Sequence, residues 1–245
     1  MYSFLKNNIF SIYLGTTLSK FAGFLRQIFI AALFGVGIAY DAYNYAYIIP
    51  GFLIIIIGGI NGPLHNAVVA VLTPLEENRA SQVFQNISLR IMLFLLIISI
   101  LIFVNAELII NIIGPNLDKE TQLIAARQLK ILSPCIPLSG FNGLSYGALN
   151  SKNKFFTSSI SPIIVSIVTI IFISIYWFFN LKNQIFNNLF YAELLSLATL
   201  AGTFIQTIIQ IYETHKIGLI KFKFNLKKSF SEENRIFNLI IPASF

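Results

Sequence analysis

The chain has 245 residues, of which 56% are hydrophobic and only 11% are charged, and its formal net charge is +7. A soluble domain carries about 25% charged residues, so this chain lacks the side chains needed to cover a water-exposed surface. Bulky apolar residues are too abundant for a disordered chain, and the apolar runs are too continuous for the alternating strands of an outer-membrane barrel. We therefore expect an all-α polytopic membrane protein.

Six apolar segments are long enough to cross a bilayer, whose hydrocarbon core of about 30 Å requires roughly 20 residues per helix. They lie at residues 9–34, 42–73, 86–105, 123–149, 155–180 and 185–212. We expect residues 1–215 to form a six-helix transmembrane unit and residues 216–235 to form a basic cytoplasmic linker. A seventh helix, at 236–245, is too short to cross, which predicts that the chain is part of a longer protein.

Lysine and arginine are distributed unequally between the connections. If the N-terminus is cytoplasmic, the outer connections hold Lys119 and Lys182, whereas the inner segments hold ten basic residues. Cytoplasmic loops carry an excess of Lys and Arg, so this bias predicts a cytoplasmic N-terminus. The inner set comprises Lys6, Arg79, Lys152, Lys154, Lys216, Lys221, Lys223, Lys227, Lys228 and Arg235.

The basic linker alternates lysine with phenylalanine and isoleucine. Such a segment can lie on anionic lipid of the inner leaflet, or it can simply be a positively charged loop that joins two halves of a protein. Nucleic-acid binding is the weaker alternative for this charge, and we expect no nucleic-acid partner.

The first apolar segment carries charge at membrane depth. Lys20 and Arg26 lie near its middle, where a charge costs about 2.5–3.5 kcal/mol. On a helix, they share an arc of about 120° with Thr16, Ser19, Gly23 and Gln27. The stripe can face a water-filled cavity that receives an anion, which we favour, or it can pair with an acid for structural reasons.

Two further segments contain helix-breaking residues. In the second segment, Gly58, Gly59, Gly62 and Pro63 interrupt the helix beside Asn61, and transporters use such breaks as substrate sites or hinges. A kink that only packs against a neighbour is the alternative. The prolines and glycines of 134–147 allow bending of the fourth segment.

Several polar residues in these segments have simpler interpretations. We interpret His65 as a hydrogen-bonded packing residue rather than a proton carrier. Arg127 and Lys130 lie near the outer end of the fourth segment, where they can be interfacial anchors or the cationic rim of a cavity.

The sequence offers no pattern for catalysis or for a bound cofactor. Its one cysteine, Cys135, excludes an intramolecular disulfide and argues against a cysteine-based metal site. Metalloprotease, nucleophile-elbow and nucleotide-binding motifs do not occur. An acid–base enzyme would need paired groups, and carboxylates do not cluster in the apolar segments. We expect no enzyme activity, no cofactor and no metal.

Two motifs resemble those of a known family. Ser19–Arg26 (SKFAGFLR), followed by Ala32–Gly35 (ALFG) and by Asp41, is similar to the S-R-x-x-G-x-x-R…LFG…DA opening of the MviN/MurJ family of lipid II flippases. Gly147–Phe155 (GALNSKNKF) resembles the GAxLNxxxRF turn of the same family, and Pro162 follows as expected. The resemblance covers essentially the whole chain.

This resemblance implies the six-helix N-terminal lobe of a two-lobe transporter plus the start of a seventh helix. The family belongs to the multidrug/oligosaccharidyl-lipid/polysaccharide exporter superfamily. The resemblance also implies a flippase that moves lipid II, the undecaprenyl-diphosphate-linked peptidoglycan precursor, from the inner to the outer leaflet for cell-wall synthesis. Its partners would be lipid II, membrane lipids and the C-terminal lobe of the same protein, in the cell inner membrane. Another exporter of the superfamily, for polysaccharide-lipid or drugs, and a non-transporting membrane scaffold are the alternatives.

The resemblance also implies roles for individual residues. Lys20 and Arg26 would attract the diphosphate, and Asp41 would be a functional acid near the outer gate. With Ser19, Gly23 and Asn61, they are the candidate substrate-binding residues.

The chain departs from the family pattern at two places. Lys20 replaces the usual arginine and so loses the two-pronged hydrogen bonding that suits phosphate. Ile54 and Ile55 stand where many members carry two basic residues.

Overall fold

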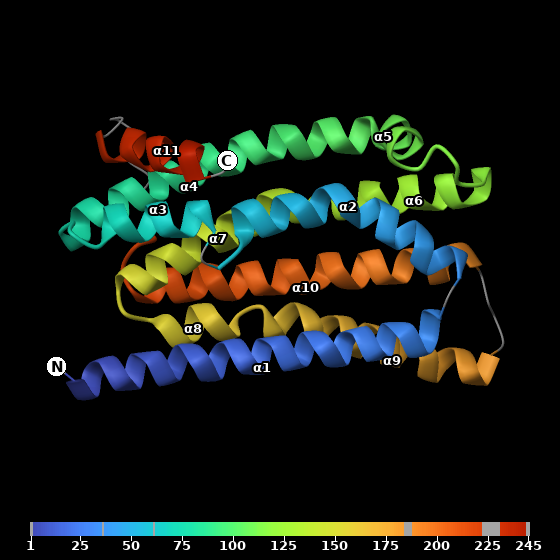
Figure 1. Cartoon of the computed structure of the whole chain (residues 1–245), viewed down its shortest axis with the longest axis horizontal. Coiled ribbons are helices and arrows are strands. Elements are labelled where there is room, and N and C mark those ends of the chain that lie inside the picture. Colours follow the sequence, from blue (N-terminus) through green and yellow to red (C-terminus); the bar gives the residue numbers. More distant parts are fainter. Residues whose placement is uncertain (1, 36, 61, 184–187, 222–230, 244–245) are drawn as a thin grey trace.

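A computed structural model of the chain describes residues 2–35, 37–60, 62–183, 188–221 and 231–243. Every element within these ranges is a helix, which confirms the all-α prediction, and the long helices run side by side along one axis (Figure 1). In chain order they are α1 (Tyr2–Phe34), α2 (Ile38–Gly58), α3 (Pro63–Leu72), α4 (Glu77–Val104), α5 (Ala106–Ile113), α6 (Lys119–Leu132), α7 (Cys135–Ser151), α8 (Phe155–Ile160), α9 (Ile163–Asn183), α10 (Asn188–Lys216) and α11 (Ser231–Ala243).

Among the described residues, five stretches rather than the predicted six are long and apolar enough to cross a membrane. They are Ile9–Phe34, Ile38–Leu72, Glu77–Val104, Phe155–Phe179 and Glu193–Lys216. The fourth predicted span, 123–149, is instead divided between α6, of 14 residues, and α7, of 17 residues. Proline is the reason, because it removes a helical hydrogen bond and clashes with the preceding turn. Pro134 lies where α6 and α7 meet.

Proline also divides two other predicted apolar segments. Pro63 begins α3 after the glycines that end α2, a position at which the missing proline N–H costs nothing. Pro162 separates α8 from α9. The break in the second segment was predicted from the sequence, whereas the break at Pro162 was not.

Helix α10 lies in the interior of the bundle. It packs against α2, α6, α7 and α9, while α1 packs against α8 and α9. One continuous core of buried apolar side chains joins α2, α3, α4, α6 and α7. The interior thus brings together helices that are far apart in the sequence.

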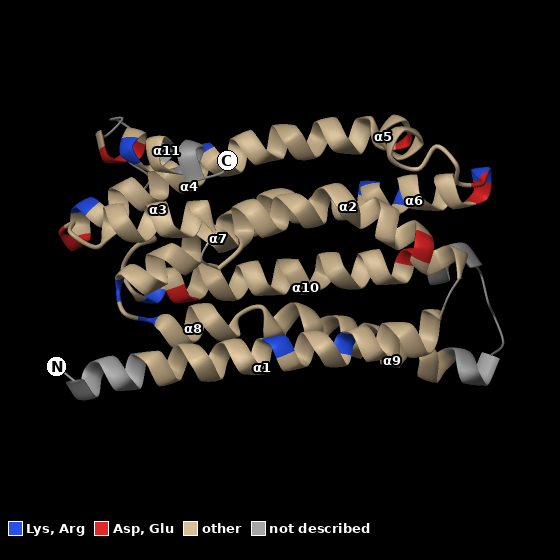
Figure 2. Cartoon of the chain, viewed as in Figure 1, with Lys and Arg blue, Asp and Glu red and all other residues tan. Residues whose placement is uncertain are grey.

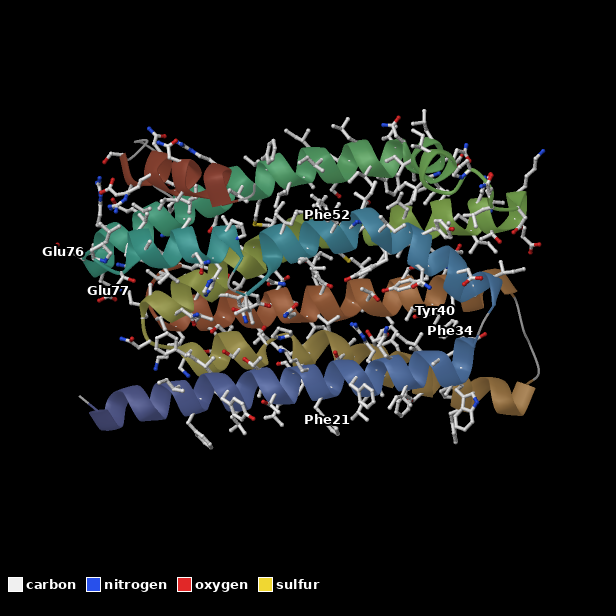
Figure 3. The ribbon with its side chains drawn as sticks, viewed as in Figure 1. Phe21, Phe34, Tyr40, Phe52, Glu76 and Glu77 are labelled. Carbon is white, nitrogen blue, oxygen red and sulfur yellow. The ribbon has the colours of Figure 1, made fainter. Side chains whose placement is uncertain are left out.

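The outward faces of the bundle are apolar, and charge is confined mainly to its ends. Most of the ribbon coloured for Lys, Arg, Asp and Glu lies toward the two ends, while two basic bands lie midway along α1 (Figure 2). The sequence of α1 has Lys20 and Arg26 in this middle part. Phe21, on the same helix, is 59% exposed and points away from the bundle (Figure 3). An exposed apolar band between charged ends is the surface that a lipid bilayer covers.

The N-terminal end of α1 and helix α11 lie at the same end of the bundle (Figure 1). Part of the basic linker predicted at 216–235, residues 222–230, lies outside the described residues. Helix α11 begins at Ser231, ahead of Ile236, where the sequence pattern placed the start of the next helix.

Candidate functional site

A polar pocket of about 450 Å³ lies at mid-length of α1, enclosed by α1, α2, α7, α9 and α10. It holds three of the candidate residues, Ser19, Gly23 and Arg26. Its other lining residues are Tyr47, Ile54, Ile55, Gly58, Gly59, Ile60, Ser139, Asn142, Tyr146, Pro162, Val165, Ser166, Thr199, Thr203 and Gln206.

Arg26 gives this pocket its charge. Its side chain is half-buried, and its Nε atom is buried without a hydrogen-bond partner among the described residues. The lining contains no Asp or Glu. A guanidinium group offers donors and no acceptor, and an unpaired charge away from water is costly. The pocket can therefore offset that cost by holding water or an anion.

The deep side of the pocket is a hydrogen-bonded cluster of neutral side chains. Asn142 of α7 donates from Nδ2 to Oε1 of Gln206 of α10 at 3.2 Å, and Gln206 donates from Nε2 to the Tyr146 hydroxyl at 2.7 Å. The Oδ1 atom of Asn142, which is 2% exposed, is buried without a hydrogen-bond partner in the described part of the chain. Buried polar atoms are almost always partnered, often by water, so this atom is an acceptor that a water molecule in the pocket could satisfy.

Helix α10 contributes polar side chains to the pocket that were not predicted from the sequence. Thr199, Thr203, Gln206 and Gln210 recur at helical spacing within an apolar segment and form one buried face. The threonine hydroxyls form hydrogen bonds within α10 itself. Thr203, for example, donates to the backbone carbonyl of Thr199 at 2.8 Å. Their periodicity was a usable signal for a polar interior.

Ser19 performs a structural task at the edge of the pocket. Its hydroxyl is 2.9 Å from the carbonyl oxygen of Ser159 and 3.2 Å from that of Ile160. These carbonyls lie at the end of α8, where Pro162 interrupts the helix and leaves backbone acceptors unpaired. The bond therefore attaches α1 to the break between α8 and α9.

The remaining candidates lie outside the pocket. Lys20 is exposed, about 120° around α1 from Arg26, and within the described residues it forms no ion pair. Asp41 is exposed in the first turn of α2 and does not line the pocket. Asn61 lies outside the described residues. The structure thus brings together Ser19, Gly23 and Arg26 and places Lys20 and Asp41 elsewhere.

The break between α2 and α3 packs directly on α7. A Cβ atom on Gly58 would lie 2.7 Å from the carbonyl oxygen of Ser139, so glycine permits the close approach. Nearby, His65 is 4% exposed, and its ring nitrogens lie 3.0 Å from Asn66 Oδ1 and 2.8 Å from Asn150 Nδ2. His65 is therefore a hydrogen-bonded packing residue, as expected.

The two basic residues at the far end of the bundle do not line the pocket. Arg127 lies 3.9 Å from Glu193, and Lys130 lies 2.9 Å from Glu107. Both are paired with acids near an end of the bundle, which agrees with interfacial anchors rather than a cationic rim.

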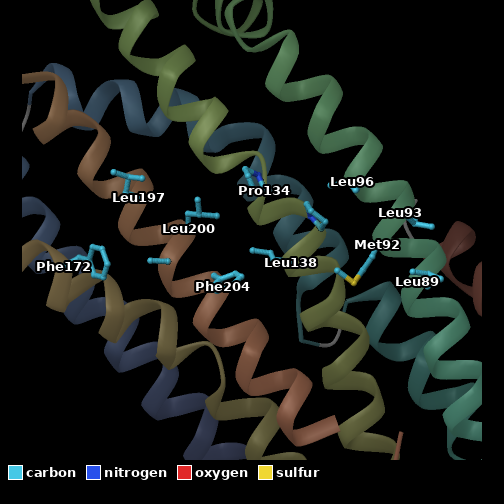
Figure 4. A pocket seen from close by; sticks show the side chains of 12 residues that line it. Leu89, Met92, Leu93, Leu96, Pro134, Leu138, Phe172, Leu197, Leu200 and Phe204 are labelled. Carbon is cyan, nitrogen blue, oxygen red and sulfur yellow. The ribbon is translucent and has the colours of Figure 1, made fainter. Parts of the chain in front are cut away.

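A second, larger cavity of about 860 Å³ lies between α4, α7 and α10 (Figure 4). Leu, Met, Phe, Pro and Ala residues line it, among them Leu93, Leu138 and Phe204. It offers no side chain that could bind a phosphate group, so the pocket at Arg26 is the candidate site.

The fold and the pocket together define a class of protein. Membrane-length helices, interrupted near a cationic pocket at mid-depth, are typical of a polytopic membrane transporter lobe. The family model described as "Lipid II flippase MurJ" matches residues 30–245. The chain belongs to this family, and it is a multi-pass membrane protein.

Individual relatives agree with this assignment. The probable lipid II flippase MurJ of Synechocystis sp. is 34% identical over 235 residues, which cover 94% of this chain and 44% of that protein. The lipid II flippase MurJ of Thermosipho africanus is 32% identical over 163 residues, or 66% of this chain and 34% of its own length. The chain therefore spans less than half the length of these curated relatives.

Solved structures show the same fold. A lipid II flippase MurJ in an inward closed conformation matches 95% of this chain and 46% of its own length, with a TM-score of 0.74 and 27% identity. A MATE protein in complex with MaL6 matches with a TM-score of 0.71 at 15% identity, a likeness of fold alone.

Proposed function

We propose that this chain is the N-terminal lobe of a flippase that carries lipid II from the inner to the outer leaflet and that it catalyses no chemical reaction. The observation that carries the proposal is Arg26, a cation at membrane depth in a polar pocket without a carboxylate. Its relatives are named lipid II flippases. The described residues also contain no cluster of His, Cys, Asp and Glu that could hold a metal ion.

The chemistry of the substrate fits this pocket. A diphosphate that leaves water loses a large solvation energy unless fixed donors replace its hydration. Arg26 supplies the charge and a donor, its Nε atom, that is unpaired among the described residues. Asn142 and Gln206 hydrogen-bond to one another and form a neutral polar wall of the pocket. The polyprenyl tail of lipid II needs no pocket, because it can remain in the hydrocarbon of the bilayer. The pocket therefore receives only the charged part of the substrate.

We place the protein in the cell inner membrane with its N-terminus in the cytoplasm. The excess of Lys and Arg in the inner connections supports this orientation. The rest of the protein would supply the second lobe, and rocking of the two lobes would expose the pocket to each side in turn. Lipid II, membrane lipids and the second lobe are then its partners, and nucleic acid is not.

Lys20 and Arg26 would contribute unequally to binding of the diphosphate. They lie on different sides of α1, so Lys20 can reach the same ligand only from the face that a second lobe would cover. We expect Arg26 to bind the diphosphate directly and Lys20 to attract it at longer range. Asp41 and Asn61 stay candidates for the outer gate and for the break between α2 and α3.

The test is transport of fluorescent lipid II by the full-length protein in proteoliposomes. Arg26→Ala should lower the rate at least tenfold, because a hydrogen bond to a charged group contributes about 1.5–3 kcal/mol. Lys20→Ala should have a smaller effect. Arg127→Ala is the matched control, because it removes an arginine that does not line the pocket.

Normal transport by Arg26→Ala would contradict the assignment, and absence of transport by the unsubstituted protein would favour a non-transporting membrane scaffold. Competition distinguishes the remaining alternatives. Inhibition by other prenyl-diphosphate sugars or by drugs, but not by unlabelled lipid II, would favour another exporter of the superfamily.

A further inference from the structure

The segment that follows α10 is attached to the beginning of α4. The Ser81 hydroxyl donates to the backbone carbonyl of Leu219 at 3.0 Å, and Lys221 Nζ donates to Asn78 Oδ1 at 2.7 Å. Leu219 is fully buried. Gly218 has a φ of 77°, which favours glycine, and a Cβ atom there would lie 2.7 Å from a Glu77 carboxylate oxygen. The chain therefore turns sharply against α4.

Helix α11 returns to the same part of α4. Arg79 donates two hydrogen bonds to Glu232, from Nε to Oε1 at 3.2 Å and from Nη2 to Oε2 at 3.1 Å. This two-pronged geometry is the strong form of an arginine–carboxylate pair. Ile236, one turn further along α11, is fully buried in the main core. The apolar face of α11 is thus part of the lobe.

The second acid of α11 lies deeper than the first. The Glu233 side chain is 0% exposed, and its carboxylate lies 2.7 Å from Arg90 Nη1 and 2.9 Å from Asn86 Nδ2. A buried carboxylate that loses its cation is left as an uncompensated charge, which is strongly destabilising. Arg90 therefore contributes to holding Glu233, and with it α11, in place.

These contacts bear on how two lobes would move. The segment that connects α10 to α11 is attached at both of its ends. Residues 217–221 and Ser231–Ile236 are both fixed to the first four turns of α4, a helix of the first lobe. We propose that Glu232 and Glu233, with Arg79, Arg90 and Asn86, form a clasp that makes α11 a rigid part of the first lobe. The pivot between lobes then lies after α11 and not in the basic linker. This inference rests on the proposed two-lobe function for its role in transport.

A crosslink within the full-length protein in membranes tests the clasp. Cys135, which is buried, is first removed as Cys135→Ala. Arg79→Cys and Glu232→Cys then introduce two thiols that face one another, and a short bismaleimide joins them. In this background Glu233 and Arg90 are the remaining ion pair of the clasp, so the crosslinking yield reports on that pair.

We expect Glu233→Gln and Arg90→Gln each to lower the yield at least about tenfold, because each removes the ion pair and Arg90→Gln also takes a cation away from the fully buried Glu233 carboxylate. Arg90→Lys should retain most of the yield. Glu76→Gln, an exposed acid next to α4, is the matched control and should change nothing. If Glu233→Gln does not accumulate in membranes, Arg90→Gln decides the question, because the Arg90 side chain is 45% exposed.

The crosslinked protein should also transport lipid II at the rate of the uncrosslinked protein. Loss of transport on crosslinking, or a yield that does not respond to Glu233→Gln and Arg90→Gln, would overturn the inference. A protein that crosslinks as expected but moves no lipid II before or after crosslinking supports the clasp and contradicts the proposed function instead.

Discussion

The Ser19 hydroxyl donates a hydrogen bond to the backbone carbonyl of Ser159, 140 positions further along the chain, at 2.9 Å. This bond holds α1, the helix that supplies Arg26 to the pocket, against the end of α8. Ser19 lines the pocket, yet its hydroxyl hydrogen is already committed to the protein backbone. The polar stripe of α1 therefore combines a structural residue with a candidate ligand.

We predict that Ser19→Ala destabilises the protein without abolishing transport. Loss of the hydrogen bond should lower the free energy of unfolding by about 1 kcal/mol, measured by thermal unfolding in detergent. Thr17→Ala removes an exposed hydroxyl of the same helix and is the control. Unchanged stability together with lost transport would identify Ser19 as a ligand.

Two glycines beside the pocket should respond in opposite ways to alanine. At Gly58 the added methyl group would lie 2.7 Å from the Ser139 carbonyl oxygen, and overpacking of this kind costs about 1–3 kcal/mol. At Gly23 the nearest atom, Ser166 Oγ, is 4.0 Å away, so Gly23→Ala should stabilise α1 by about 0.5–1 kcal/mol. Unfolding of both variants in detergent checks the prediction, and equal stability would show that the break is not tightly packed.

Restoring a basic residue on α2 should strengthen phosphate binding. Ile55 lines the pocket and is 72% exposed, so arginine can be accommodated there. We expect Ile55→Arg to tighten binding of a short-chain prenyl diphosphate by up to about tenfold, which is about 1.4 kcal/mol. The gain should shrink at high salt, because screening weakens exposed charges.

Titration of binding at two salt concentrations measures this effect. Ile48→Arg places the same charge at an exposed position of α2 outside the pocket and should leave affinity unchanged. An equal gain from both substitutions would show that net charge alone, and not the pocket, determines binding.

The stability of the first turn of α6 should depend on pH. Asp118 caps this helix, and hydrogen bonds from the Thr121 hydroxyl at 2.6 Å and the Thr121 backbone N–H at 2.9 Å hold its pKa below the ordinary value. A pKa lowered by folding means that the charged cap stabilises the helix above the unfolded value of about 3.9. This stabilisation is lost as pH falls through the folded pKa.

Hydrogen exchange of the first amides of α6, followed from neutral to acidic pH, measures how much the Asp118 cap stabilises the helix. Protection of the Thr121 amide should fall in acid, after correction for the intrinsic exchange rate. Asp118→Asn, which can still accept the bond but does not titrate in this range, should remove the pH dependence. A dependence that persists in this variant would assign it to another group.

Much of the fold followed from local sequence features. Apolar runs predicted a helical membrane protein, and Pro63 with its neighbouring glycines predicted the break in the second segment, because proline and glycine act on the backbone within one turn. Pro134 likewise ends α6, although the length of its apolar segment suggested one continuous span. The break at Pro162 was missed because the apolar pattern continues across it.

The site was only partly predictable, because a helical wheel gives relative angles and no neighbours. An arc of about 120° is wide enough for one edge to face the interior and the other to face outward, so the sequence grouped Lys20 with Arg26 while the packing of α1 separates them. Asn142 and Gln206 belong to different helices, and periodicity cannot pair them.

The sequence by itself determined that the chain is helical, membrane-embedded and cationic at mid-depth, since hydropathy and charge are properties of each residue. Tertiary structure decided which cation enters a pocket, which polar atoms lie opposite it and where α11 docks. Those outcomes depend on side chains far apart in the sequence, such as Arg79 and Glu232 at a separation of 153 positions, that meet only when the helices pack.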